Sequence, residues 1–390
     1  MRISVLAATL TVAAWMGLAA TPSQADLFVT SGSTNAVFRY DGTTGAFISA
    51  ISGGGLVTPR GMAFGPDGNL YVGGGPLGTS QVLRFNAATG AFLDVFVPPG
   101  SGGLALADTL AFGPDGNLYI TGDGFTLDVK RYNGATGAFL GTFIPSSVLD
   151  TCGPDGLTFG SDGNLYVGCN TGSVLRFNGT TGALLDTFVP VGSGGLNGAE
   201  ALVFGPDGSL YVSSQRTDQV LRYNGATGGF LDVFASGGGL DAPWGLAFGP
   251  DGNFYVASFN TNNVLRYNGR TGAFMDIFAS GASPIAIAFT RVPEPSALTL
   301  IGIGALILGV SRWRHRPAGI KHVELRVRDD RASSPEATIV SDGGRSCYQF
   351  ATTLTRIRRG PTAIVAYSCR SMSGRLGRVE SGQLVGENFS

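Results

Sequence analysis

One pattern of apolar and polar residues repeats along most of the chain. An apolar run that ends in Phe leads into a Gly-Pro-Asp-Gly-Asn turn and a second run, Leu-Tyr-Val, as in residues 64–72. Asp-Gly between two apolar runs favours a tight turn, because Gly tolerates positive φ and the Asp side chain caps the turn. The copies begin 44 to 48 residues apart, at Phe64, Phe112, Phe159 (with Ser161 in place of Pro), Phe204 and Phe248.

A second pair of apolar runs follows each copy. In the first unit these runs are residues 82–85 and 91–96, joined by an Asn-Ala-Ala-Thr-Gly turn. All the runs are rich in Val, Leu, Phe and Tyr and are too short for helices. Each unit therefore predicts four short antiparallel strands, which is one blade of a β-propeller.

The two ends of the repeat region complement each other. Residues 26–51 contain the last three strands of a unit, whereas residues 284–289 contain a first strand with nothing after it. Pairing them closes the ring and removes two sheet edges. We therefore predict an all-β fold, a six-bladed β-propeller of four-stranded antiparallel blades over residues 26–291.

Composition and charge favour a globular protein and argue against one class of partner. The chain has 390 residues, of which 62 are Gly, and these fall at the turns of the repeat, which favours a globular protein over a low-complexity one. Residues 26–291 contain 11 Arg and Lys against 19 Asp and Glu. An acidic surface of this kind argues against nucleic acid as a partner.

Charged residues also follow the repeat. Each predicted third strand has an Arg, at positions 39, 84, 131, 176, 222 and 266. Four fourth strands have an Asp across the hairpin: Asp94, Asp186, Asp232 and Asp276. We interpret them as cross-strand charge pairs. Ser49 and Gly141 leave Arg39 and Arg131 without this partner.

One position differs between blades in a way that suggests a site. The residues four positions before the final Phe of each first strand are Arg60, Asp108, Asp155, Glu200, Trp244 and Ile285. The first strand of a blade is innermost, so we expect these residues around one mouth of the central channel. Asp108, Asp155 and Glu200 would suit a hard cation such as Ca²⁺, although the pattern makes no cofactor certain. Alternatively Arg60 neutralises them, or the mouth is simply solvated, while Trp244 offers a stacking face for a sugar ring.

Catalytic motifs are scarce in the repeat region. Both histidines, His315 and His322, lie outside it, and no nucleophile elbow, phosphate-binding loop or zinc spacing occurs within it. Cys152 and Cys169 fall at the same edge of one predicted blade. They form either a disulfide or two unlinked thiols.

Residues 1–25 are typical of a secretory signal peptide with a signal helix. Arg2 provides the positive start, residues 5–20 the apolar run, and Ser-Gln-Ala the cleavage site. A buried helix or a membrane anchor is the alternative.

Residues 292–316 resemble the PEP-CTERM sorting segment of Gram-negative bacteria. They contain the triplet Pro293, Glu294 and Pro295, the apolar run 297–310, and an Arg cluster at Arg312, Arg314 and Arg316. The resemblance implies export, transient anchoring in the inner membrane by a short membrane helix, processing by an exosortase, and residence in the envelope or in exopolysaccharide. Residues 317–390 are predicted to be a mostly disordered tail or, alternatively, a small cytoplasmic domain.

The blades resemble NHL-type and streptogramin-lyase-type propellers and, more distantly, gluconolactonase-like ones. The resemblance rests on the Phe-Gly-Pro-Asp-Gly-Asn-Leu-Tyr-Val units. Lyases of that kind use a catalytic His, which this propeller lacks. We therefore expect a non-enzymatic binding or scaffold module of the envelope or exopolysaccharide. The alternatives are a metal-dependent lactonase-like or lyase-like enzyme that uses the channel, and a surface protein without a specific ligand.

Overall fold

A computed structural model describes residues 25–122, 126–281 and 283–290, together with four short strands further on. Two compact units are distinguished, Met1–Glu294 and Pro295–Ser390. In the second unit β25 (Glu324–Val327) pairs with β26 (Ala337–Val340), and β27 (Gln349–Ala351) pairs with β28 (Ser368–Arg370). The predicted signal helix, sorting segment and membrane helix lie outside the described residues. Disorder of residues 317–390 remains a prediction.

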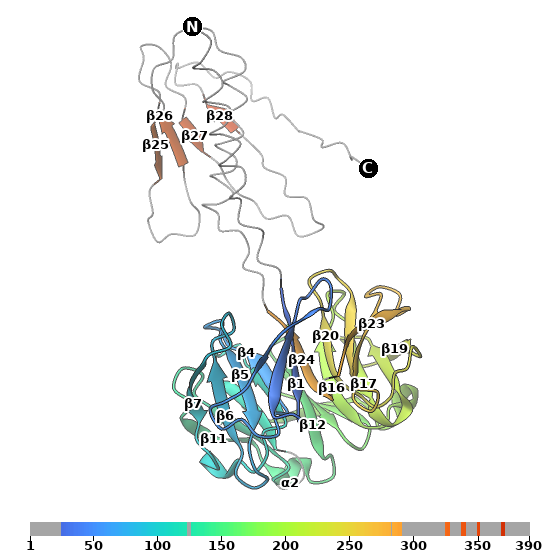
Figure 1. Ribbon diagram of the computed structural model, residues 1–390. Helices are drawn as coiled ribbons and strands as arrows, with labels where there is room; N and C mark the ends of the chain where they lie inside the picture. Colours follow the sequence, from blue (N-terminus) through green and yellow to red (C-terminus); the bar gives the residue numbers. More distant parts are fainter. Residues whose placement is uncertain are drawn as a thin grey trace. The chain divides into compact units, whose positions relative to one another are not determined.

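The first unit is an all-β propeller of six four-stranded antiparallel sheets, as predicted (Figure 1). Blades 1 to 3 are β4 (Met62–Phe64), β5 (Leu70–Gly74), β6 (Gln81–Phe85) and β7 (Phe92–Val97); β8 (Thr109–Phe112), β9 (Leu118–Gly122), β10 (Asp128–Tyr132) and β11 (Phe139–Ile144); and β12 (Pro154–Phe159), β13 (Leu165–Cys169), β14 (Ser173–Phe177) and β15 (Leu184–Val189). Blades 4 and 5 are β16 (Ala199–Phe204), β17 (Leu210–Ser214), β18 (Gln219–Tyr223) and β19 (Phe230–Ser236); and β20 (Pro243–Phe248), β21 (Phe254–Ser258), β22 (Asn263–Tyr267) and β23 (Phe274–Ser280). Blade 6 is β24 (Pro284–Phe289), β1 (Leu27–Ser31), β2 (Ala36–Tyr40) and β3 (Phe47–Ile51). The short helices are η1 (Ser101–Gly103), α2 (Ser146–Leu149), η2 (Ser193–Gly195) and η3 (Gln215–Thr217).

The ring closes within blade 6, where the two ends of the propeller meet. Strand β24 pairs with β1, and Phe289 lies opposite Leu27. The backbone N–H of Thr290 donates to the carbonyl oxygen of Asp26 at 2.9 Å. The innermost strands β4, β8, β12, β16, β20 and β24 contact one another in this order, and β24 contacts β4. The predicted sixth blade, assembled from both ends of the repeat region, is confirmed.

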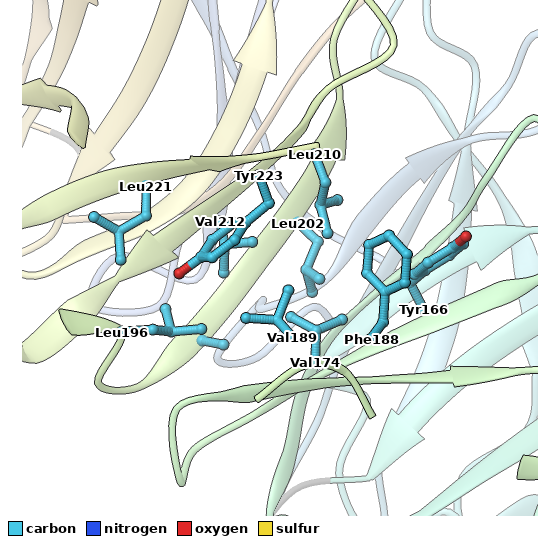
Figure 2. Packing of buried hydrophobic residues seen from close by; sticks show 11 residues of the cluster. Tyr166, Val174, Phe188, Val189, Leu196, Leu202, Leu210, Val212, Leu221 and Tyr223 are labelled. Atoms are coloured by element: carbon cyan, nitrogen blue, oxygen red, sulfur yellow. The ribbon is translucent and has the colours of Figure 1, made fainter. Parts of the chain in front are cut away.

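The apolar residues of the repeat fill the spaces between neighbouring blades. Figure 2 shows the cluster between blades 3 and 4, where Tyr166 of β13 packs against Phe188 of β15 and faces Leu202 and Leu210 of the next blade. The Tyr166 ring also meets the edge of Phe204 at 5.0 Å. Aromatic pairs of this kind contribute about 0.5–1.5 kcal/mol each beyond the area that they bury. The Leu-Tyr-Val strand and the two Phe positions of each unit thus specify blade-to-blade packing.

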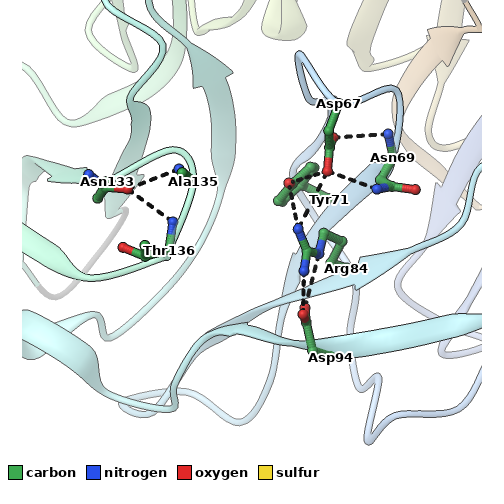
Figure 3. Close-up of polar contacts among 8 residues, drawn as sticks. All are labelled: Asp67, Asn69, Tyr71, Arg84, Asp94, Asn133, Ala135 and Thr136. Carbon is green, nitrogen blue, oxygen red and sulfur yellow. Dashed lines mark hydrogen bonds and ion pairs between the residues drawn. The ribbon is translucent and has the colours of Figure 1, made fainter.

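A polar network links the two hairpins of blade 1, where the Nη1 of Arg84 donates to Asp67 at 3.4 Å (Figure 3). In blade 1 the Nε of Arg84 donates to Asp94 at 3.1 Å, and Asp67 accepts hydrogen bonds from Asn69 and the Tyr71 hydroxyl. Burial raises the pKa of Asp67, but these hydrogen bonds outweigh burial and bring its pKa below the ordinary value. The predicted Arg–Asp pairs form in four blades: Arg84–Asp94, Arg176–Asp186, Arg222–Asp232 and Arg266–Asp276.

In each blade the turn between the third and fourth strands is closed by an Asn or Asp side chain. In blade 2 the Oδ1 of Asn133 accepts hydrogen bonds from the backbone N–H groups of Ala135 and Thr136, each at 3.0 Å (Figure 3). The same turn appears with Asp41, Asn86, Asn178, Asn224 and Asn268. This Asx-type capping is the local reason why each Asn-x-x-Thr-Gly stretch reverses the chain.

A disulfide joins Cys152, which precedes β12, to Cys169 at the end of β13. The two Cα atoms lie 4.9 Å apart, the residues are 17 positions apart in sequence, and both side chains are buried in the apolar cluster between blades 2 and 3. In the chain-entropy view, closing a loop of this size stabilises the folded state by about 3 kcal/mol.

We expect the double variant Cys152→Ala/Cys169→Ala to lose about 2–4 kcal/mol of unfolding free energy, because the unfolded chain regains the entropy of the open loop. Urea unfolding monitored by circular dichroism measures the loss. Reductant should shift the wild-type midpoint to that of the variant and leave the variant unchanged. Equal midpoints for the oxidised wild type and the variant would contradict this stabilisation.

Candidate functional site

The six predicted mouth residues lie at the beginnings of the innermost strands. Asp155, Glu200, Trp244 and Ile285 are in β12, β16, β20 and β24, while Arg60 and Asp108 just precede β4 and β8. The innermost strands approach closely here, since a Cβ added to Gly61 would lie 2.6 Å from the carbonyl oxygen of Asp108. The six positions therefore occupy corresponding places at one end of a tightly packed ring.

A recurrent backbone feature places these side chains. In five of the described blades the residue two positions earlier has positive φ: Thr58, Gly153, Gly198, Ala242 and Ser283. Three of these five are not Gly, and an L-residue in this conformation costs free energy unless its surroundings hold it there. A side chain of the preceding blade does so in blades 1, 5 and 6, in the pairs Asn35–Thr58 (2.8 Å), Asp218–Ala242 (2.9 Å) and Asn262–Ser283 (2.8 Å). Blades 5, 6 and 1 thus present a pre-organised part of the mouth.

A pocket of about 250 Å³ lies in this part of the mouth, lined by residues that include Ser33, Thr58, Arg60, Trp244, Phe259 and Ser283. The rings of Trp244 and Phe259 stack with centroids 4.6 Å apart and planes at 10°. Trp244 is in β20 and Phe259 directly follows β21, so blade 5 presents an aromatic wall of two stacked rings, each of which covers one face of the other. Flat aromatic surfaces are suited to stacking against other rings.

The polar groups around the pocket differ in which hydrogen bonds they already make. The hydroxyls of Thr58 and Ser283 donate to the carbonyl oxygen of Gly75 (3.1 Å) and to Asn262, so their oxygens are left as acceptors. The Nε1 of Trp244 is buried, and no acceptor for its N–H occurs in the part of the chain that the structure describes. The Trp244 N–H is therefore shielded from the pocket, which offers an aromatic wall, hydrogen-bond acceptors and the guanidinium donors of Arg60.

Arg60 links this pocket to the acidic side of the mouth. Its Nη1 lies 2.8 Å from Asp108, and the two side chains are 29% and 11% exposed. Asp155 is 2% exposed, and its carbonyl oxygen accepts the Thr121 hydroxyl at 2.9 Å. Arg60 thus pairs with one carboxylate of the mouth, which is one of the alternatives that the sequence suggested.

Ca²⁺ binding by Asp108, Asp155 and Glu200 stays a prediction. Within residues 25–122, 126–281 and 283–290, no group of three or more His, Cys, Asp or Glu side chains is placed to hold a metal ion. Asp108, Asp155 and Glu200 occupy equivalent positions in three blades, but Asp108 pairs with Arg60 and Asp155 is buried.

Sequence reasoning missed Phe259, Thr58 and Ser283. Phe259 follows its Leu-Tyr-Val-type strand at a position where the other blades have Gly75, Asp123, Asn170, Gln215 and Gly32. Aligning the units on these strands would have shown Phe259 as the aromatic exception. Thr58 and Ser283 gave no such signal, because their role depends on backbone conformation.

Comparisons with known proteins add a sorting signal and confirm the fold. The chain is a six-bladed β-propeller protein by its structure. It carries a PEP-CTERM protein-sorting motif, matched over residues 291–316. No curated protein matches the sequence.

Two solved structures illustrate the likeness of fold. A chain of the crystal structure of a nidogen/laminin complex shares 16% identity at a TM-score of 0.53, covering 69% of this chain and 98% of that one. A protein of unknown function from Bacteroides caccae shares 13% identity at a TM-score of 0.52, covering 69% and 100%. At such identities the likeness concerns the fold alone. Among the described residues, no helix has the length and apolarity needed to cross a membrane.

Proposed function

We propose that this protein is an exported, non-catalytic carbohydrate-binding propeller whose mouth pocket holds one sugar ring. The observation that carries the proposal is the stacked pair Trp244 and Phe259 beside Arg60 and the Thr58 and Ser283 hydroxyls. A sugar ring has apolar C–H faces and a rim of hydroxyls, which an aromatic wall flanked by donors and acceptors complements. A pocket of about 250 Å³ is smaller than the about 300–1,000 Å³ of drug-sized sites, which suits one ring of a longer chain.

The sorting signal also supports a carbohydrate ligand. The PEP-CTERM motif indicates an exported, envelope-associated protein and is consistent with processing by an exosortase. The Cys152–Cys169 disulfide fits an oxidising compartment. A soluble propeller released there would meet the polysaccharide of the envelope and the matrix, so we propose this polysaccharide as the partner. We do not propose catalysis, since both histidines lie outside the propeller.

The test uses the fluorescence of Trp244. The protein has three Trp residues, so the substitutions Trp15→Phe and Trp313→Phe leave Trp244 as the single one. We expect oligosaccharides from purified exopolysaccharide of the producing bacterium to change its emission. Phe259→Ala should weaken binding roughly tenfold, because a buried aromatic contact is typically a binding hot spot.

Phe47→Ala is the matched control, because Phe47 is an aromatic residue on a strand of another blade and 58% exposed. It should bind as the parent protein does. Calorimetry of Trp244→Ala provides a second measurement that does not depend on fluorescence. Saccharide binding that survives unchanged in both Phe259→Ala and Trp244→Ala would place the site elsewhere, and no binding of any fraction would refute the function.

A further inference from the structure

One guanidinium of the propeller differs from its equivalents. In five blades the Arg of the third strand donates from Nε to a carboxylate: Arg84 to Asp94, Arg176 to Asp186, Arg222 to Asp232, Arg266 to Asp276 and Arg39 to Asp26, at 2.7 to 3.2 Å. In blade 2 the Nε of Arg131 is buried and has no acceptor among the described residues. The Nε–H of Arg131 is thus the one among the six equivalent Nε–H groups that has no carboxylate acceptor among the described residues.

The surroundings of Arg131 otherwise match those of its equivalents. Its Cζ lies 5.4 Å from the centroid of the Phe143 ring, within the 5.1–5.5 Å range of the four blades with an Arg–Asp pair. Arg131 is opposite Gly141 in the strand register, just as Arg84 is opposite Asp94. The guanidinium also interacts with Tyr119 and with Asp115 of the first turn. The blade therefore keeps the pose of the guanidinium and lacks only the carboxylate that the fourth strand provides in the four blades with an Arg–Asp pair.

The space beside Gly141 is free of other atoms, and Gly141 has φ 144°, a conformation that L-residues rarely adopt. A Cβ added to Gly141 would meet no atom within 4 Å. The planar guanidinium can pair with a carboxylate through two parallel hydrogen bonds, and such charge-assisted bonds are stronger than neutral ones. The four internal pairs show this geometry with the Nε and Nη2 atoms of their Arg residues.

The outer edge of strand β11 indicates which kind of partner supplies a carboxylate to Arg131. Strand β11 is the outermost strand of its sheet, so one of its edges has no neighbour within that sheet. Such an edge accepts an added extended segment through its backbone groups. Phe139 and Leu140 of β11 are 39% and 46% exposed and offer apolar contacts. Gly141 leaves no side chain between an added strand and Arg131.

We propose that Arg131, Gly141 and the edge of β11 form a docking site for an extended polypeptide segment with an acidic side chain, which pairs with the Arg131 guanidinium. A polypeptide satisfies both the edge and the guanidinium, whereas a uronate sugar would satisfy the guanidinium alone. This site involves none of the pocket residues and is independent of carbohydrate binding.

The test is fluorescence polarisation of the full-length protein with a labelled seven-residue peptide of alternating Thr and Val that has one central Glu. A peptide with Gln in place of the Glu is the matched probe. We expect the Glu peptide to bind at least roughly tenfold more tightly than the Gln peptide, and Arg131→Gln to remove this preference. Gly141→Asp should also remove it, because the internal carboxylate then pairs with the guanidinium; since φ at Gly141 is 144° and strains an L-residue, the circular dichroism of this variant is compared with that of the wild type.

Asp94→Gly provides the reciprocal test, because it removes the carboxylate that faces Arg84 in blade 1. This variant should bind two Glu peptides where the wild type binds one. Equal affinity for the two peptides, an unchanged preference in Arg131→Gln, or displacement of the Glu peptide by glucuronate at the same concentration would overturn the proposal. The comparison of the two peptides on wild-type protein needs no variant to fold.

Discussion

Removing residues 284–290, which contain β24, is expected to abolish cooperative folding of the propeller. The strand completes blade 6 and contacts the innermost strands of both neighbouring blades. Ile287 is 7% exposed, and the Phe289 ring packs against Tyr255 at 4.8 Å. Burying a side chain of this size stabilises by about 1.5–3 kcal/mol, and the deletion also leaves the backbone groups of β1 without partners. The combined loss is comparable with the whole stability of a domain, about 5–15 kcal/mol.

A circular permutant is the matched control for this deletion. It begins with residues 284–289 and joins Phe289 to Leu27 through the Gly-Pro-Asp-Gly-Asn turn that links Phe64 to Leu70 in blade 1. Because Phe289 already lies opposite Leu27, the turn should form without rearranging the sheet. Near-ultraviolet circular dichroism and urea unfolding should show a native permutant and an unfolded deletion variant. A sharp unfolding transition in the deletion variant would show that the ring does not need β24.

The number of blades and the closure of the ring were predictable because the turn residues and the pattern of apolar strands indicate the same structure. Each Asp-Gly turn requires positive φ at its Gly, which the structure shows at Gly68, Gly116, Gly163, Gly208 and Gly252. The strand pattern on both sides of the turn then fixes which faces are buried. The Arg–Asp pairs followed from the same register, since opposite residues on adjacent strands are neighbours.

The site was only partly predictable, because it depends on contacts between blades. The repeat placed Arg60 and Trp244 in equivalent positions, and both line the pocket. It gave no reason to single out Asp108 as a partner of Arg60. Phe259 joins Trp244 only through the local path of the chain after β21. Pairing across blades is set by side-chain direction and packing, which a one-dimensional alignment of units does not contain.

Replacing Pro293, Glu294 and Pro295 by Ala is expected to keep the full-length protein in the cell membrane fraction. These residues belong to the matched PEP-CTERM motif, and we propose that the wild type is cut there by an exosortase after export. Without the triplet, the apolar run 297–310 remains attached. This run is shorter than the about 20 residues that usually span a bilayer, but its flanking arginines favour retention of the C-terminal side in the cytoplasm.

Fractionation and mass spectrometry of the C-terminus in a host with an exosortase measure this effect. The wild type should be recovered without residues after the triplet, whereas the triple variant should keep them and stay membrane-bound. A variant that ends after Arg316 is the control for residues 317–390 and should be processed as the wild type is, because it keeps the whole matched segment 291–316. The circular dichroism of the triple variant should equal that of the wild type, because β24, the last strand of the propeller, ends at Phe289. Release of the triple variant in trimmed form, or an intact C-terminus on released wild-type protein, would show that the motif does not direct processing.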